Sequence, residues 1–200
     1  MADQQAPSAG PDLSKGIALG DFSGAVLLGH VGDQEVVLVR VGSDILAIDA
    51  HCSHYHGPLA EGLVTGETIR CPWHHACFDL RTGEATHAPA INPLSVWKVE
   101  REGEKIFVRE KREQPKPRLK GPTDAPGRIV IIGGGAAGFA AAEMLRRQDF
   151  RGSIVMLSSE TSPPVDRPNL SKDYLAGNAP EDWLPLKPDE FYADQKIDLK

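Results

Sequence analysis

The chain has few cysteines and no long apolar segment, and both shortages exclude classes of protein. Only 3 of its 200 residues are cysteine, and the opening MADQQAPSAGPDLSKG has neither a charged nor an apolar region of the kind found in signal peptides. A disulfide scaffold is therefore not expected, and metal-binding thiols in a reducing compartment, the cytoplasm, fit better. The longest apolar run, residues 129–145, is short, rich in glycine and contains Glu143, so we expect no membrane span.

Basic residues are also in short supply. The chain has 22 lysines and arginines against 28 acidic residues, a net charge of −6, and residues 1–111 alone hold 15 acidic and 9 basic side chains. Nucleic acid is not an expected partner, because its phosphates need a basic patch. An acidic front half suits docking to a basic protein, although a solvated acidic surface is the commoner reason for such a composition.

The front half of the chain predicts a small all-β domain. Segments rich in valine and isoleucine occur at residues 35–41, 45–49, 94–100 and 105–110. Glycine-containing turn sequences separate them, and no helical period of useful length intervenes. We assign the domain to residues 13–111 and interpret residues 1–12 as a disordered leader.

The composition of the chain changes twice after residue 111. Residues 112–127, REQPKPRLKGPTDAPG, contain four prolines and predict an extended linker. After it, RIVIIGGGAAGFAAAEMLRRQ predicts a buried strand, a glycine turn and a helix, and SIVMLSS predicts a second strand. Residues 128–200 are therefore predicted to begin an α/β, Rossmann-like domain.

Two short segments concentrate the metal-binding side chains. Cys52 and His54 form C-x-H, Cys71 and His74 form C-x-x-H, and sixteen residues separate the pairs. Zinc fingers usually pair cysteine with cysteine, whereas here each segment offers one thiolate and one imidazole. This suits an iron–sulfur cluster with two cysteines on one iron and two histidines on the other. A Cys₂His₂ zinc site remains the alternative.

The sequence C-x-H…C-P-W-H, followed by A-C-F-D-L-R-T-G-E, resembles a Rieske [2Fe–2S] domain. The resemblance covers residues 13–111 and implies a small antiparallel β-sandwich with two cluster-binding loops. It also implies that Cys52, His54, Cys71 and His74 are the cluster ligands.

The loops depart from many Rieske loops, which carry glycine where this chain has His56 and His75. Either histidine can compete as a ligand, but the usual spacing favours His54 and His74. Cys77 is interpreted as a small buried hydrophobe. High-potential respiratory relatives join the loops by a disulfide at the positions of Gly57 and Trp73, so a low potential, nearer roughly −150 mV than +300 mV, is expected.

The glycine turn follows a strand, opens a helix and matches G-x-G-x-x-G. Such glycines let the backbone approach a pyrophosphate at a helix N-terminus, and a carboxylate after the second strand accepts ribose hydroxyls. Ser159 and Glu160 both occupy the ribose region, and the carboxylate favours Glu160. The predicted dinucleotide site contains Gly133, Gly135, Ala136, Ala137, Gly138 and Glu160.

The segment VDRPNLSKDYLAG, residues 165–177, is similar to the D-R-P-x-L-S-K segment of FAD-dependent ferredoxin reductases, including those that resemble apoptosis-inducing factor. The resemblance implies that Arg167 and Lys172 hold FAD; Asn169 stands where proline is frequent. A flavin can take the two electrons of a nicotinamide hydride and pass them singly to an iron–sulfur cluster. No catalytic side chain is assigned, because the predicted residues hold cofactors.

Together these features predict electron transfer through a Rieske-type cluster within a FAD-dependent NAD(P)H oxidoreductase, with an oxygenase or ferredoxin-like protein as redox partner. Residues 128–200 are few for a complete FAD-binding domain, so we expect a portion of a longer flavoprotein whose NAD(P)H-binding domain lies elsewhere. The alternatives are an electron-carrier module beside an inactive flavoprotein remnant, and a zinc-stabilised structural domain.

Overall fold

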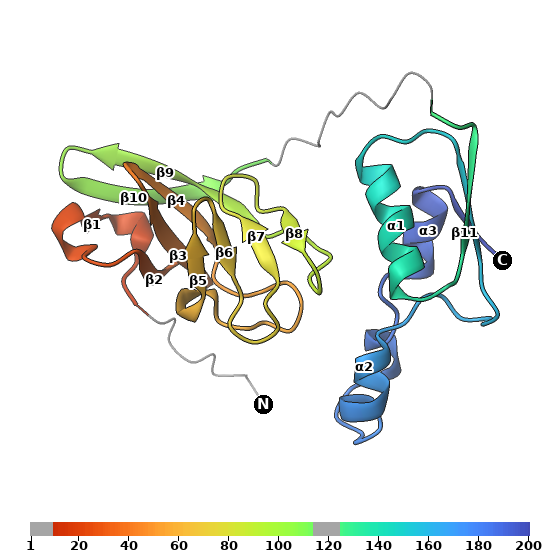
Figure 1. Ribbon diagram of the computed structural model, residues 1–200. Coiled ribbons are helices and arrows are strands. Elements are labelled where there is room, and N and C mark those ends of the chain that lie inside the picture. Colours follow the sequence, from red (N-terminus) through yellow and green to blue (C-terminus); the bar gives the residue numbers. More distant parts are fainter. Residues whose placement is uncertain (1–9, 114–124) are drawn as a thin grey trace. The chain divides into compact units, whose positions relative to one another are not determined.

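The computed structural model describes residues 10–113 and 125–200 (Figure 1). It divides into two compact units, one before and one after residue 114. Most of the predicted leader and most of the predicted linker lie outside the described residues.

The end of the predicted leader takes part in the first unit. The backbone N–H of His30 donates to the carbonyl oxygen of Pro11 over 3.0 Å. The side chain of Asp12 accepts from the backbone N–H of Ser14 and so caps the short 3₁₀ helix η1 (Leu13–Lys15). Pro11 and Asp12 therefore belong to the folded unit, although the predicted boundary lies at residue 13.

The first unit contains two antiparallel sheets, as the sequence predicts for its fold class. In spatial order, the six-stranded sheet consists of β1 (Ile17–Ala18), β10 (Lys105–Lys111), β9 (Val96–Glu102), β4 (Asp44–Asp49), β3 (Gln34–Val41) and β2 (Val26–Val31). The four-stranded sheet consists of β5 (Leu63–Thr65), β6 (Thr68–Arg70), β7 (Cys77–Asp79) and β8 (Ala85–His87). Two further 3₁₀ turns are η2 (Leu19–Asp21) and η3 (Leu59–Glu61).

Tight hairpins set the register of these strands. Two-residue connections join β2 to β3, β3 to β4, β5 to β6 and β9 to β10, and each begins with a glycine. The four glycines have φ close to +60°: Gly32, Gly42, Gly66 and Gly103. A positive φ at this position matches the turn to the twist of the flanking strands, and glycine adopts it without steric cost.

The central strand β3 is buried on both faces. Val37 and Val39 belong to a core on one side of the six-stranded sheet, and Val36 and Leu38 belong to a core on the other side. The second core is closed by Leu13 and other residues that precede β2. The first core also contains the two cysteines of the predicted ligand set.

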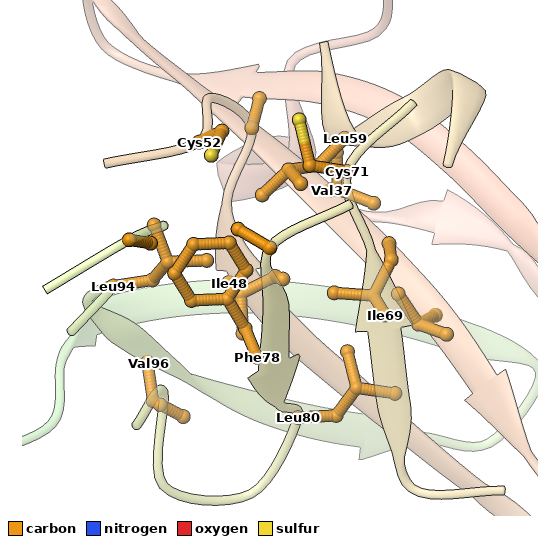
Figure 2. Packing of buried hydrophobic residues seen from close by; sticks show 14 residues of the cluster. Val37, Ile48, Cys52, Leu59, Ile69, Cys71, Phe78, Leu80, Leu94 and Val96 are labelled. Carbon is orange, nitrogen blue, oxygen red and sulfur yellow. The ribbon is translucent and has the colours of Figure 1, made fainter. Parts of the chain in front are cut away.

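Figure 2 shows how the first core supports these cysteines. Their sulfur atoms lie along one side of the core, whereas Leu80 and Val96 lie toward the opposite side in this view. The ring of Phe78 lies between, and its side chain is fully buried. Packing of this core therefore determines where the two thiols are held.

The second unit is a three-stranded parallel sheet with helices. Its elements are β11 (Arg128–Ile132), α1 (Ala136–Arg147), β12 (Ser153–Leu157), α2 (Arg167–Asn169), the π-helical turn η4 (Leu170–Tyr174), η5 (Glu181–Trp183), α3 (Asp189–Asp194) and β13 (Ile197–Leu199). The strand order is β11-β12-β13, and both pairs are parallel. The predicted strand, turn, helix and second strand are all present. The first strand, β11, is not buried as predicted, because Val130 is 50% and Ile132 is 87% exposed.

One arginine ties the end of α1 to the strands. The guanidinium of Arg146 donates to the carbonyl oxygens of Phe150, Gly152, Gln195 and Lys196. These bonds join the helix to the turns that lead into β12 and β13. None of the helices within residues 10–113 and 125–200 combines the length and apolar content that a membrane crossing needs.

Candidate metal centre

The first predicted ligand loop, residues 52–57, is a tight backbone turn that starts at Cys52. The backbone N–H of Cys52 donates to the carbonyl oxygen of Gly57 over 2.9 Å. The backbone N–H of His56 donates back to the carbonyl oxygen of Cys52 over 3.0 Å. These two bonds close the loop and hold its side chains in a defined order.

The second loop, residues 71–76, repeats this backbone pattern. The N–H of Cys71 donates to the carbonyl oxygen of Ala76 over 2.8 Å, and the N–H of His75 donates to the carbonyl oxygen of Cys71 over 3.1 Å. The two loops therefore present their cysteines from equivalent positions, although their sequences differ.

The same pattern explains the two additional histidines. His56 has φ of 56° and His75 has φ of 64°, so both lie in the left-handed region at the fourth position after each cysteine. Glycine adopts this region most easily, which accounts for its frequency at these positions in Rieske loops. Both imidazoles are exposed.

The other two histidines come together from the two loops. The ring centroids of His54 and His74 lie 5.0 Å apart, with an interplanar angle of 84°. Tyr55 stacks on the His54 ring at 4.0 Å and meets the His74 ring edge-on at 5.7 Å. The Nδ1 atom of His54 is buried. The structure therefore pairs the two histidines that the usual spacing favours.

The thiols of Cys52 and Cys71 form the second pair. Each residue is 1% exposed, and neither is in a disulfide. Burial raises the pKa of the Cys52 thiol to about 11; the backbone N–H of His54 lowers it, and the neighbouring Cys71 sulfur raises it further. Two adjacent buried thiolates need a compensating positive charge, which iron ions supply.

The donors therefore lie as a pair of thiols and a pair of imidazoles. A single tetrahedral zinc ion would need all four donors around one point. A [2Fe–2S] cluster with mixed ligands takes two cysteines at one iron and two histidines at the other. The paired donors fit that requirement.

Side chains remote in sequence hold the first loop in place. His51 contacts Glu35 through Nε2, with 2.6 Å to Oε2, and its Nδ1 lies 3.1 Å from the carbonyl oxygen of His56. The hydroxyl of Ser53 donates to the carbonyl oxygen of Asn92 over 2.5 Å. Sequence reasoning missed these residues, because Glu35 and Asn92 lie 16 and 39 positions from their partners.

The third cysteine is buried beside the second loop. Cys77 is the first residue of β7 and is 5% exposed. This burial agrees with the interpretation of Cys77 as a small buried hydrophobe. Its sulfur also accepts from Nε of Arg70 over 3.4 Å. This contact fixes the thiol within the sheet that carries the loop.

In the second unit, the glycine turn joins β11 to α1. Gly133 has φ of 120°, a conformation that side chains rarely adopt, and its N–H donates to the carbonyl oxygen of Leu157. A Cβ on Gly138 would lie 2.0 Å from the carbonyl oxygen of Gly133, whereas a Cβ on Gly135 would meet nothing within 4 Å. The turn thus leaves open space at Gly135, where a pyrophosphate approaches in dinucleotide-binding folds.

Two of the predicted FAD-binding side chains contact each other. Arg167 forms an ion pair with Glu160, 2.5 Å between the guanidinium and the carboxylate. Glu160 also lines a cavity of about 430 Å³ beside the carboxyl ends of β12 and β13, together with Gly134. Lys172 is exposed on η4 and is not among the described residues that line this cavity.

Comparison with known protein families agrees with both halves of the chain. Residues 19–98 match the Rieske [2Fe-2S] domain family. Residues 127–197 match the pyridine nucleotide-disulphide oxidoreductase family. The chain therefore belongs to the Rieske [2Fe–2S] family, and residues 127–197 are similar to the pyridine nucleotide-disulphide oxidoreductase family.

Individual relatives match the chain to different extents. Apoptosis-inducing factor 3 of Homo sapiens is 33% identical over 181 residues, which cover 85% of this chain and 29% of that protein. The 3-phenylpropionate/cinnamic acid dioxygenase ferredoxin subunit of Shigella flexneri is 40% identical over 81 residues, 40% of this chain and 76% of that protein. The solved ferredoxin of carbazole 1,9a-dioxygenase from Nocardioides aromaticivorans is 33% identical, covers 46% of this chain and 92% of its own, and has a TM-score of 0.45.

Proposed function

We propose that the protein transfers electrons through a [2Fe–2S] cluster bound by Cys52, Cys71, His54 and His74. The observation that carries this proposal is the pairing of the two thiols and the two imidazoles across two loops of matching backbone. When bound, the cluster would supply one-electron chemistry, and its two neutral imidazole ligands would raise the potential above that of an all-cysteine cluster.

The protein's own residues would hold and shield this group. The buried thiols approach it from the core, where water is excluded. The exposed edge of His74 gives a redox partner access to the imidazole side. Tyr55 packs against both imidazoles and restricts their rotation.

We further propose that the second unit binds FAD and that the full protein takes electrons from NAD(P)H. The open space at Gly135, at the N-terminus of α1, suits a pyrophosphate, and the cavity lined by Glu160 suits a ribose. Glu160 would accept ribose hydroxyls once its pairing with Arg167 rearranges, and Lys172 would come from η4. A flavin would divide a hydride into single electrons for the cluster.

The electron acceptor proposed for the cluster is an oxygenase or a ferredoxin-like protein. The support is the name of one relative, a ferredoxin subunit of a dioxygenase, which matches 40% of this chain. Two curated relatives that match 85% of this chain are much longer, and the match spans 29% of their length. The activity of the complete protein is therefore part of this proposal.

Metal content and the visible spectrum test the central claim. The protein is reconstituted anaerobically with iron and sulfide, and we expect about two irons and two sulfides per chain with visible absorption bands. Cys52→Ser, Cys71→Ser, His54→Ala and His74→Ala should each abolish the bands. The matched control is His87→Ala, an exposed histidine of β8, which should retain them. One tightly bound zinc without visible bands would instead establish the zinc alternative.

A further inference from the structure

The two ligand loops touch at a glycine and a tryptophan. A Cβ placed on Gly57 would lie 2.8 Å from Sγ of Cys71, 3.1 Å from Cδ2 of Trp73 and 3.3 Å from Cε3 of Trp73. The Cα of Gly57 in the first loop therefore packs directly against the indole and the thiol of the second loop. Trp73 is 54% exposed, so its indole covers this junction from the solvent side.

Glycine is needed at residue 57 because a side chain there would not fit between the loops, and not because of its backbone conformation. Its φ lies outside the positive range in which glycine is favoured, unlike the hairpin glycine Gly32. An alanine at residue 57 would meet no backbone strain, but its methyl group would push the indole and the sulfur away. The two loops can therefore approach each other closely only because residue 57 has no side chain.

No covalent bond joins the loops here, because Cys52, Cys71 and Cys77 are all free. We propose that Trp73 is a positioning residue that closes the two loops over the sulfur of Cys71 by packing on Gly57. The indole also shields the sulfur from water.

This inference rests on the proposed cluster and predicts two of its properties. Solvent access to a coordinating sulfur stabilises the reduced cluster, which carries one more negative charge, so removing the indole should raise the reduction potential. Access also speeds attack on the iron by a chelator. Replacing a residue that supports metal ligands typically changes metal affinity 10–100-fold. We therefore expect the variant without the indole to lose its iron to a chelator at least about tenfold faster than the wild-type protein.

The test uses the full chain with its cluster and compares Trp73→Ala, Trp73→Phe and Gly57→Ala. The measurements are the half-life of the visible bands with excess iron chelator and the reduction potential. Trp73→Ala and Gly57→Ala should each shorten the half-life at least about tenfold and raise the potential. Trp73→Phe should restore most of the half-life and most of the potential, because its ring can still pack on Gly57.

Two controls separate this contact from general effects. Gly20→Ala adds a methyl group in the same unit where nothing lies within 4 Å, and Trp183→Ala removes a tryptophan that is 65% exposed in the other unit. Both should behave as wild type. Wild-type half-life and potential in Trp73→Ala, or no recovery in Trp73→Phe, would overturn the inference while the cluster stands. Absence of a cluster in the wild-type protein would overturn the proposed function itself.

Discussion

Replacing His56 by glycine should stabilise the first unit and leave its cluster in place. His56 has φ of 56°, and its imidazole is exposed. A left-handed conformation costs an L-residue roughly 1–2 kcal/mol. Glycine avoids that cost but loses about 0.5–1 kcal/mol through its greater freedom in the unfolded chain. The expected net gain is therefore about 0.5–1 kcal/mol.

The contacts of residue 56 support this estimate, because they are made by its backbone. Its N–H donates to the carbonyl oxygen of Cys52, and its carbonyl oxygen lies 3.1 Å from Nδ1 of His51. Both survive in the glycine variant. His75, with φ of 64° at the equivalent position of the second loop, should respond in the same way.

Urea unfolding of the cluster-bearing protein, followed by far-UV circular dichroism, measures the change. With a slope of roughly 1 kcal/mol per M for a small domain, the midpoint should rise by about 0.5–1 M. The contrasting variant is His54→Gly, which removes a proposed ligand two residues earlier and should bleach the visible bands. The reasoning is refuted if His56→Gly bleaches them or lowers the urea midpoint.

Two further predictions concern the core and the glycine turn. Phe78→Ala should lower the free energy of unfolding of the first unit by about 3–5 kcal/mol, because a fully buried ring is lost from the core beneath the thiols; a urea midpoint within error of wild type would contradict this. In the complete flavoprotein, Gly138→Ala should disrupt the second unit, because its methyl group would collide with the carbonyl oxygen of Gly133. Gly135→Ala should fold there but bind FAD more weakly, because its methyl group would occupy the space left for a pyrophosphate. Circular dichroism measures folding of the two variants, and quenching of flavin fluorescence measures FAD binding. If both variants lose the fold, or if both bind FAD as the wild-type protein does, Gly138 and Gly135 do not have these separate roles.

Local sequence signals determined much of the fold. The four longer strands that were predicted, β3, β4, β9 and β10, contain valine or isoleucine, and each adjoins a glycine turn at one end or both. Such signals act within a few residues, so they can be read without knowledge of the tertiary structure. The strands β5 to β8 escaped prediction because three residues each are too few to show an alternating pattern, and the six-residue strand β2 was also missed.

The spacing of cysteine and histidine determined the candidate ligands. It did not show where the imidazoles of the two competing histidines, His56 and His75, point. Only the backbone shows that His56 and His75 occupy left-handed positions with exposed side chains. Only the folded loops bring the rings of His54 and His74 into contact. The difference arises because side-chain direction depends on φ and ψ, which the hydrogen bonds of the whole loop impose.

Tertiary structure alone decided which remote residues support the site. Sheet pairing brings Glu35 to His51, and the segment before β9 brings Asn92 to Ser53. The contact of Gly57 with the indole of the second loop likewise joins segments that no local pattern connects. Such contacts depend on strand register and on the packing of one shared core, and these are properties of the folded chain as a whole.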